Sequence, residues 1–169
     1  VYNAVNVVDP AATSSSGIFS GTIKSMVIGD GVKRIPTHFT HDKAIIGTLT
    51  IPEGLESIGD NAFFGTDQID ELYYNAVNCV ANDVSGGICW RPVKIIIGDG
   101  VKSIPCGFAC RNSNLVSVEI PVSVTHMGNN AFNHHNPVEI NYKGTFAQWA
   151  DIDFDNDKAN PLFYSKSLK

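Results

Sequence analysis

The sequence has little charge and no long apolar run. Charged residues make up 17% of its 169 positions, and 12 Lys and Arg against 17 Asp and Glu give a formal net charge of −5. A chain without a basic excess is a poor match for nucleic acid, whose phosphates attract a basic surface. No stretch is long and apolar enough for a membrane-spanning helix, whereas a hydrophobic content of 43% suits a globular domain.

Motifs of common catalytic and cofactor sites are also missing. The chain has no Gly-x-Ser-x-Gly elbow, no phosphate-binding or dinucleotide-binding glycine loop and no His-Glu-x-x-His pair. We therefore expect a protein that is not an enzyme and that binds no cofactor. A carbohydrate-active enzyme with paired acids stays an alternative, although no part of the chain departs from the repeat described next to form a cleft.

The sequence does contain a repeat. Residues 28–36 (IGDGVKRIP) return as 97–105 (IGDGVKSIP), and residues 51–63 (IPEGLESIGDNAF) return as 120–132 (IPVSVTHMGNNAF). Within this 69-residue distance, apolar residues recur every 23 positions, which defines the unit. The four apolar columns are Met26, Leu49, Leu72, Ile95 and Val118; Ile28, Ile51, Tyr74, Ile97 and Ile120; Val32, Leu55, Asn78, Val101 and Val124; and Ile35, Ile58, Ala81, Ile104 and Met127.

Each unit predicts a short strand and a turn. In Leu49-Thr50-Ile51 the alternation points two apolar side chains inward and one threonine outward. A proline (52 or 121) or a Gly-Asp-Gly then ends the strand. Residues 58–63 predict a turn followed by a helical turn, with Asp60 or Asn61 as the N-cap. The aromatic residue near the end of most units should close the coil over a shared core; these are Phe39, Phe63, Phe108 and Phe132.

The phrase IPxxVxxIGxxAF at 23-residue spacing resembles the BspA-like leucine-rich repeat family, and residues 142–149 (YKGTFAQW) resemble the YxGTxxQW ending of such arrays. The resemblance implies a right-handed solenoid of about six to seven 23-residue coils, each a short β-strand plus a turn or short helical segment. We expect it to cover residues 1–150, followed by an acidic C-terminal tail or capping segment at 151–169. It also implies an extracellular or cell-surface location in a host-associated bacterium, and a role in adhesion and protein recognition.

The outward residues of successive strands predict a binding surface. They form a ladder across the sheet, and we expect its members to contact a protein partner, namely a host or bacterial surface protein: Val27, Thr50, Tyr73, Ile96, Glu119 and Asn141. Tyr73 and Ile96, with Val27, are expected to form an apolar strip with a polar rim. The neighbouring outward positions are Thr48, Glu71, Asn75, Lys94, Ser117 and Glu139. The alternative is a structural spacer that holds another domain away from the cell surface, and a spacer needs only a polar sheet face.

Three further clusters leave alternatives open. The four cysteines (Cys79, Cys89, Cys106 and Cys110) suit buried thiols, a Cys89–Cys110 disulfide or a zinc site. Residues 151–157 (DIDFDND) alternate acids as a calcium loop does, but lack its glycine and its final acid, so we expect a solvated acidic segment. His126, His134 and His135 are expected to be surface residues, and we expect no bound metal.

Overall fold

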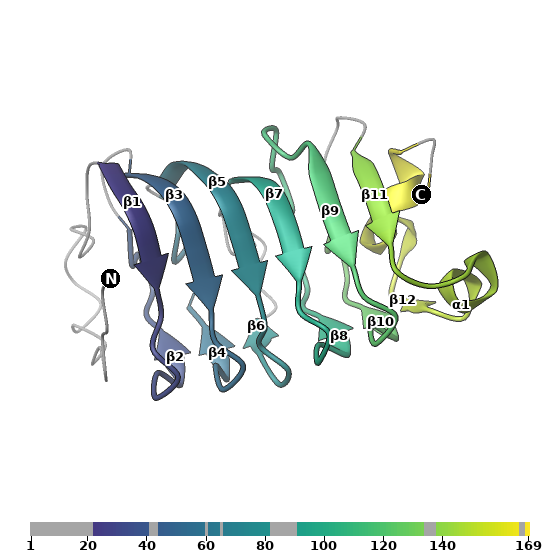
Figure 1. Ribbon diagram of the computed structural model, residues 1–169, viewed down its shortest axis with the longest axis horizontal. Helices are drawn as coiled ribbons and strands as arrows, with labels where there is room; N and C mark the ends of the chain where they lie inside the picture. Colours follow the sequence, from purple (N-terminus) through teal and green to yellow (C-terminus); the bar gives the residue numbers. More distant parts are fainter. Residues whose placement is uncertain are drawn as a thin grey trace.

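In the part of the chain that the structure describes, six parallel strands form one continuous sheet (Figure 1). The computed structural model describes residues 22–40, 44–59, 61–64, 66–81, 91–133, 138–165 and 168–169. The sheet has the order β1-β3-β5-β7-β9-β11, so each strand lies beside the strand of the next repeat. Its members are β1 (Thr22–Val27), β3 (Ala44–Ile51), β5 (Thr66–Tyr74), β7 (Pro92–Ile97), β9 (Ser117–Ile120) and β11 (Glu139–Tyr142).

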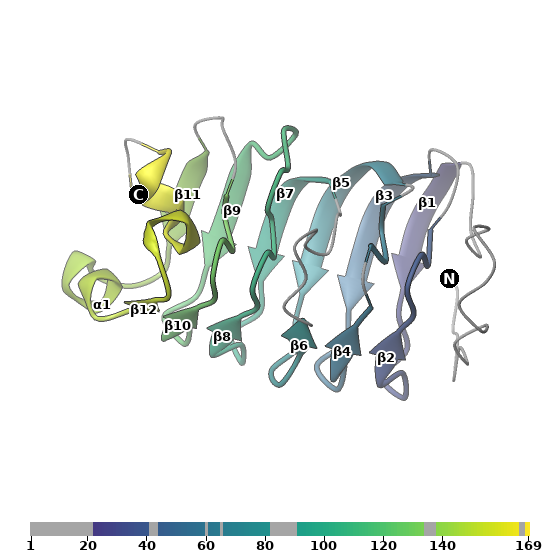
Figure 2. The same ribbon diagram turned by 180° about the vertical axis from the view of Figure 1, so that it is seen from behind.

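A second row of two-residue strands lies along the lower edge in Figure 2. It consists of two three-stranded parallel sheets, β2-β4-β6 and β8-β10-β12, and no pairing between β6 and β8 joins them within the described residues. The strands are β2 (Arg34–Ile35), β4 (Ser57–Ile58), β6 (Val80–Ala81), β8 (Ser103–Ile104), β10 (His126–Met127) and β12 (Asp153–Phe154). The architecture is therefore a β-solenoid in which five turns connect six main strands.

The strand register confirms the 23-residue unit. Met26 pairs with Leu49, Leu49 with Leu72, Leu72 with Ile95 and Ile95 with Val118, each a step of 23. The last step is shorter by one residue, because Val118 pairs with Ile140. The six main strands agree with the lower of the two predicted coil numbers, and a further coil predicted before β1 falls on residues outside the described ones.

The predicted apolar columns form the core. Their members are buried, with two exceptions in the third unit: Asn78 is exposed, and the side chain of Ala81 lies outside the described ones. Ala76, 1% exposed, is buried near Asn78, and Cys79 packs against the core. The predicted aromatic residues are all buried and pair edge to face between coils, with ring centroids 5.8 Å apart for Phe39–Phe63 and 6.1 Å for Phe108–Phe132.

The predicted helical turn at residues 58–63 is not present in the described residues. Ile58 belongs to β4, and residues 61–64 form a turn. Asn61 has a φ of 52°, in the left-handed region, whereas an N-cap residue has extended backbone, so the N-cap prediction for Asn61 is wrong; Asp60 lies outside the described residues. Asparagine suits this position because it tolerates the left-handed conformation better than most residues.

The repeated glycine of the IGxxAF phrase marks a close approach of neighbouring coils. A Cβ on Gly59 would lie 2.5 Å from the Thr37 nitrogen and 2.9 Å from the Pro36 carbonyl carbon. A Cβ on Gly128 would lie 2.7 Å from the Cys106 nitrogen. The Gly59 N–H donates to the Ile35 carbonyl at 2.8 Å, so a side chain here would push apart backbones that are hydrogen-bonded to one another.

The C-terminal phrase YKGTFAQW forms the only α-helix of the described residues, α1 (Phe146–Ala150). Thr145 and Gln148 form a capping box: the Thr145 N–H donates to Gln148 Oε1 at 2.8 Å, and the Gln148 N–H donates to Thr145 Oγ1 at 3.2 Å. Trp149 is buried with its ring centroid 5.1 Å from that of Tyr142. Gly144 leaves room for the Tyr142 ring, which a Cβ would approach to 2.6 Å.

Candidate interaction surface

The predicted outward ladder lies in register on the exposed face of the main sheet. The pairs are Val27 with Thr50, Thr50 with Tyr73, Tyr73 with Ile96, Ile96 with Glu119, and Glu119 with Asn141. All six side chains are exposed or partly exposed. The residues directly before and after each of the first five belong to the first two apolar columns and face the core. Because parallel strands lie about 4.8 Å apart, six side chains form a row about 24 Å long.

The apolar part of this ladder is shorter than predicted. Thr50 stands between Val27 and Tyr73, so Val27 does not join the strip. Tyr73, 36% exposed, and Ile96 remain as an adjacent pair. The predicted strip of three is therefore a pair, with Thr50 on one side and Glu119 on the other.

A second, polar row runs beside the ladder. Its members are in register as predicted, with Ser25 added at the start and Asn75 excluded: Ser25, Thr48, Glu71, Lys94, Ser117 and Glu139. Asn75 lies beyond the end of β5, where its side chain occupies the space in which Gly98 would carry a Cβ.

The charged side chains on this face differ in their partners from one strand to the next. Lys94 pairs with Glu119 across 3.0 Å, and Lys169 pairs with Glu139 across 3.1 Å. The Tyr73 hydroxyl donates to Glu71 Oε2 at 3.1 Å, and this hydrogen bond to a carboxylate is the main cause that raises the pKa of Tyr73. Tyr73 is thereby held over the sheet by a neighbour on its own strand.

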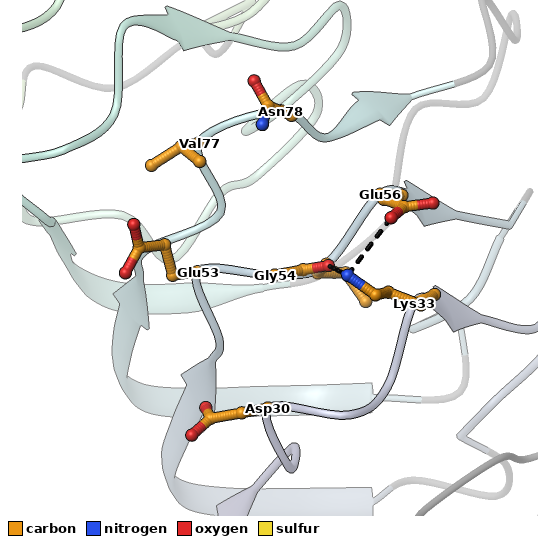
Figure 3. Close-up of a pocket in the computed structure, with 8 residues that line it drawn as sticks. Asp30, Lys33, Glu53, Gly54, Glu56, Val77 and Asn78 are labelled. Carbon is orange, nitrogen blue, oxygen red and sulfur yellow. Dashed lines mark hydrogen bonds and ion pairs between the residues drawn. The ribbon is translucent and has the colours of Figure 1, made fainter.

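A hollow opens at the carboxyl ends of β1 and β3 (Figure 3). The Lys33 side chain makes two contacts there: its Nζ donates to the Gly54 carbonyl at 3.2 Å and forms an ion pair with Glu56 at 3.2 Å. Figure 3 shows the carboxylates of Asp30 and Glu53 pointing away from Lys33. This hollow was not predicted from the sequence, although Asp30 and Glu53, 23 residues apart, occupy the same place in adjacent units and could have indicated it.

A Ser–His–Asp relay that the sequence analysis missed links the last three coils. Ser103 Oγ lies 2.9 Å from His126 Nδ1, and His126 Nε2 lies 2.9 Å from Asp155 Oδ1. The Asn129 N–H donates to Asp155 Oδ2 at 2.8 Å. The signal in the sequence is the 23-residue step from Ser103 to His126, which places them side by side on β8 and β10.

The relay connects coils at the surface. The side chains of His126 and Asp155 are 37% and 39% exposed, so water screens their interaction and weakens any stabilisation of a reacting group. The same atoms join β8, β10 and the segment after β12, and Asn156 adds side-chain hydrogen bonds to Asn129 and Asn130. We interpret the relay as a structural staple: its hydrogen bonds hold the segment after β12 against β8 and β10. His134 and His135 lie outside the described residues.

Thiols and acids give no metal site among the described residues. Cys79, Cys106 and Cys110 are free and partly buried, whereas Cys89, and with it the predicted Cys89–Cys110 disulfide, lies outside the described residues. Burial raises the pKa of Cys79 to about 11, against a smaller lowering by the hydrogen bond from Tyr74. No group of three or more His, Cys, Asp or Glu that could hold a metal occurs in this part of the chain.

The acidic segment 151–157 is folded against the last coil. β12 pairs with β10, and Ile152 is buried. It continues into two 3₁₀ helices, η1 (Asp157–Ala159) and η2 (Pro161–Phe163), and Lys169 donates its N–H to the Ile140 carbonyl at 2.9 Å. None of the described helices is long and apolar enough to cross a bilayer.

Comparison with known proteins agrees with this geometry. Residues 39–161 match the BspA type leucine-rich repeat region in six copies, which is well over half of the chain. A search of curated proteins and a search of solved structures each gave no match. Repeat regions of this type are associated with bacterial surface proteins, are generally protein-binding and are typically non-catalytic. With its 23-residue register, buried columns and matching repeat region, the chain belongs to the BspA type leucine-rich repeat family.

Proposed function

We propose that the chain is a non-enzymatic protein-binding and adhesion module of an exported or cell-surface bacterial protein, and that its partner lies on the exposed face of the main sheet. The observation that supports this face is the adjacent pair of Tyr73 and Ile96 in the middle of a polar ladder. Tyrosine is enriched among residues that dominate binding energy, and an apolar centre with a polar rim is typical of interfaces. The family supports the cell-surface part of the proposal.

The pair of residues also favours binding over a spacer role. A spacer has no use for an aromatic ring on its solvent face, where Tyr73 is 36% exposed and held by Glu71. A rigid, pre-positioned aromatic side chain loses little conformational freedom when a partner covers it.

The test is capture of extracellular and bacterial surface proteins by the immobilised chain. We expect Tyr73→Ala with Ile96→Ser to abolish capture and to leave the thermal unfolding temperature nearly unchanged, because both side chains lie outside the core. The matched control is Phe64→Ser with Val122→Ser, which removes exposed apolar residues (64% and 49% exposed) outside the ladder. Capture by the ladder variant at the wild-type level would refute the proposal.

We also propose that residues 1–150 form the array and that 151–169 close its C-terminal end. Burial of Ile152, Ala159 and Pro161 and the pairing of β12 with β10 support a cap. Ending the chain at Ala150 is expected to expose the last coil and to shift the protein to higher oligomers in size-exclusion chromatography. A monodisperse monomer with an unchanged melting temperature would contradict the cap.

A further inference from the structure

Carboxylates on the sheet face and its lower rim differ between the two halves of the solenoid. In the C-terminal half, three are matched by lysines: Glu119 by Lys94 at 3.0 Å, Asp99 by Lys143 at 3.6 Å and Glu139 by Lys169 at 3.1 Å. In the N-terminal half, Asp30, Glu53 and Glu71 form no ion pair with any described residue.

The contrast is sharpest between two equivalent positions. Asp30 and Asp99 are the aspartates of the two Gly-Asp-Gly phrases, 69 residues apart. Asp99 pairs with Lys143, whereas Lys33, the lysine that lines the same hollow as Asp30, contacts Gly54 and Glu56 instead. Lys24, toward the other end of β1, is six residues before Asp30. The described N-terminal half therefore presents a local excess of negative charge.

These carboxylates lie within reach of the apolar pair. Glu71 Oε2 accepts a hydrogen bond from the Tyr73 hydroxyl. Glu53 and Asp30 follow the ladder residues Thr50 and Val27 by three positions, a chain length of about 10 Å at most. From β1 to β7 there are three strand spacings, about 14 Å in total, which an extended peptide crosses with four or five residues.

We propose that this N-terminal half of the sheet face binds an extended basic segment of a protein partner, whose lysine or arginine side chains meet Asp30, Glu53 and Glu71 while apolar side chains cover Tyr73 and Ile96. The inference rests on the proposed function and names the chemistry of the partner. The Tyr73 ring contributes a face for a cation next to the Glu71 carboxylate, and a guanidinium or ammonium group gains from both. Asp30 and Glu53, which form no ion pair with a described residue, together with Glu71, which accepts the Tyr73 hydrogen bond, supply the complementarity that steers such a segment to this half.

The probe is a fluorescein-labelled peptide, Lys-Thr-Val-Thr repeated twice, whose extended form places Lys and Val alternately on one face. We expect it to bind in fluorescence anisotropy, and to bind more weakly as salt concentration rises. Glu53→Gln with Glu71→Gln should weaken the affinity for this peptide tenfold or more, because the two substitutions remove two charge contacts. The matched control, Asp99→Asn with Asp157→Asn, removes the same charge elsewhere and should change the affinity less than about twofold.

Three outcomes would overturn the inference: no binding of the Lys peptide, equal loss in both charge variants, or equal binding of a peptide with Glu in place of Lys. Native partner capture separates this inference from the proposed function. If Tyr73→Ala with Ile96→Ser abolishes capture and Glu53→Gln with Glu71→Gln does not, the binding face stands and the basic partner is wrong. If neither variant affects capture, both proposals fail.

Discussion

Replacing Gly59 by alanine tests whether the repeat depends on direct contact between neighbouring coils. The new Cβ would lie 2.5 Å from the Thr37 nitrogen, about 0.9 Å inside ordinary contact, and the obstacle is backbone. Gly59 has no left-handed φ, so the cost is steric. Overpacking of a core costs about 1–3 kcal/mol, and a rigid obstacle places this change near the upper end. Alanine also restricts the unfolded chain, which stabilises the folded state by about 0.4–1 kcal/mol, so the net destabilisation is about 2–2.6 kcal/mol.

The assay is thermal unfolding followed by circular dichroism. For a chain of this size, that destabilisation lowers the melting temperature by about 4–10 °C. The matched control is Gly100→Ala, whose Cβ would meet only the Val77 Cγ1 at 3.1 Å, so we expect a melting temperature within about 2 °C of the wild type. If Gly59→Ala has the melting temperature of the wild type, or if both variants lose equal stability, then the close approach of the backbones is not the reason for glycine at position 59.

Three further predictions concern single side chains. The Cys79 thiol, with its pKa raised to about 11 from 9.0, should react with iodoacetamide at pH 8 about a hundredfold more slowly than in the unfolded chain; its contribution to stability is complete below pH 9 and is lost as the pH rises toward 11. Lys169→Ala should raise the pKa of Glu139, which the Lys169 hydrogen bond lowers, and carbon NMR titration of the Glu139 carboxyl measures it; a pKa that does not move would exclude that bond. Asp155→Ala removes the acceptor of His126 and should speed amide exchange of β12 several-fold, with β5 unchanged, because an exposed pair contributes about 1 kcal/mol or less.

The sequence was sufficient to predict what depends on periodicity. Columns such as Met26, Leu49 and Leu72 repeat at the register step itself, so strand pairing, burial and the outward ladder follow from counting. The turn at 61–64 was harder to predict, because Asn61 suits both an N-cap and a left-handed turn. Short polar residues are ambiguous between these two uses.

The contacts that define the surface could be predicted from counting only in part. Counting alone places Thr50 in the ladder between Val27 and Tyr73, so the sequence already held the reason that Val27 does not join the apolar strip. The staple of Ser103, His126 and Asp155 joins residues 23 and 29 positions apart. The second step breaks the 23-residue rule, so no periodic search would have aligned it.

The interruption between β6 and β8 has a mechanical consequence. Among the described residues, the main sheet continues from β5 to β7 while no strand pairing joins β6 to β8, so this side of the solenoid resists bending less than the main sheet does. A bending load along the array should therefore concentrate its strain at this hinge, with the described coils on either side of it moving as blocks. The hinge lies next to Tyr73 and Ile96, and a change of curvature there would alter the spacing between the two strands that carry the apolar pair.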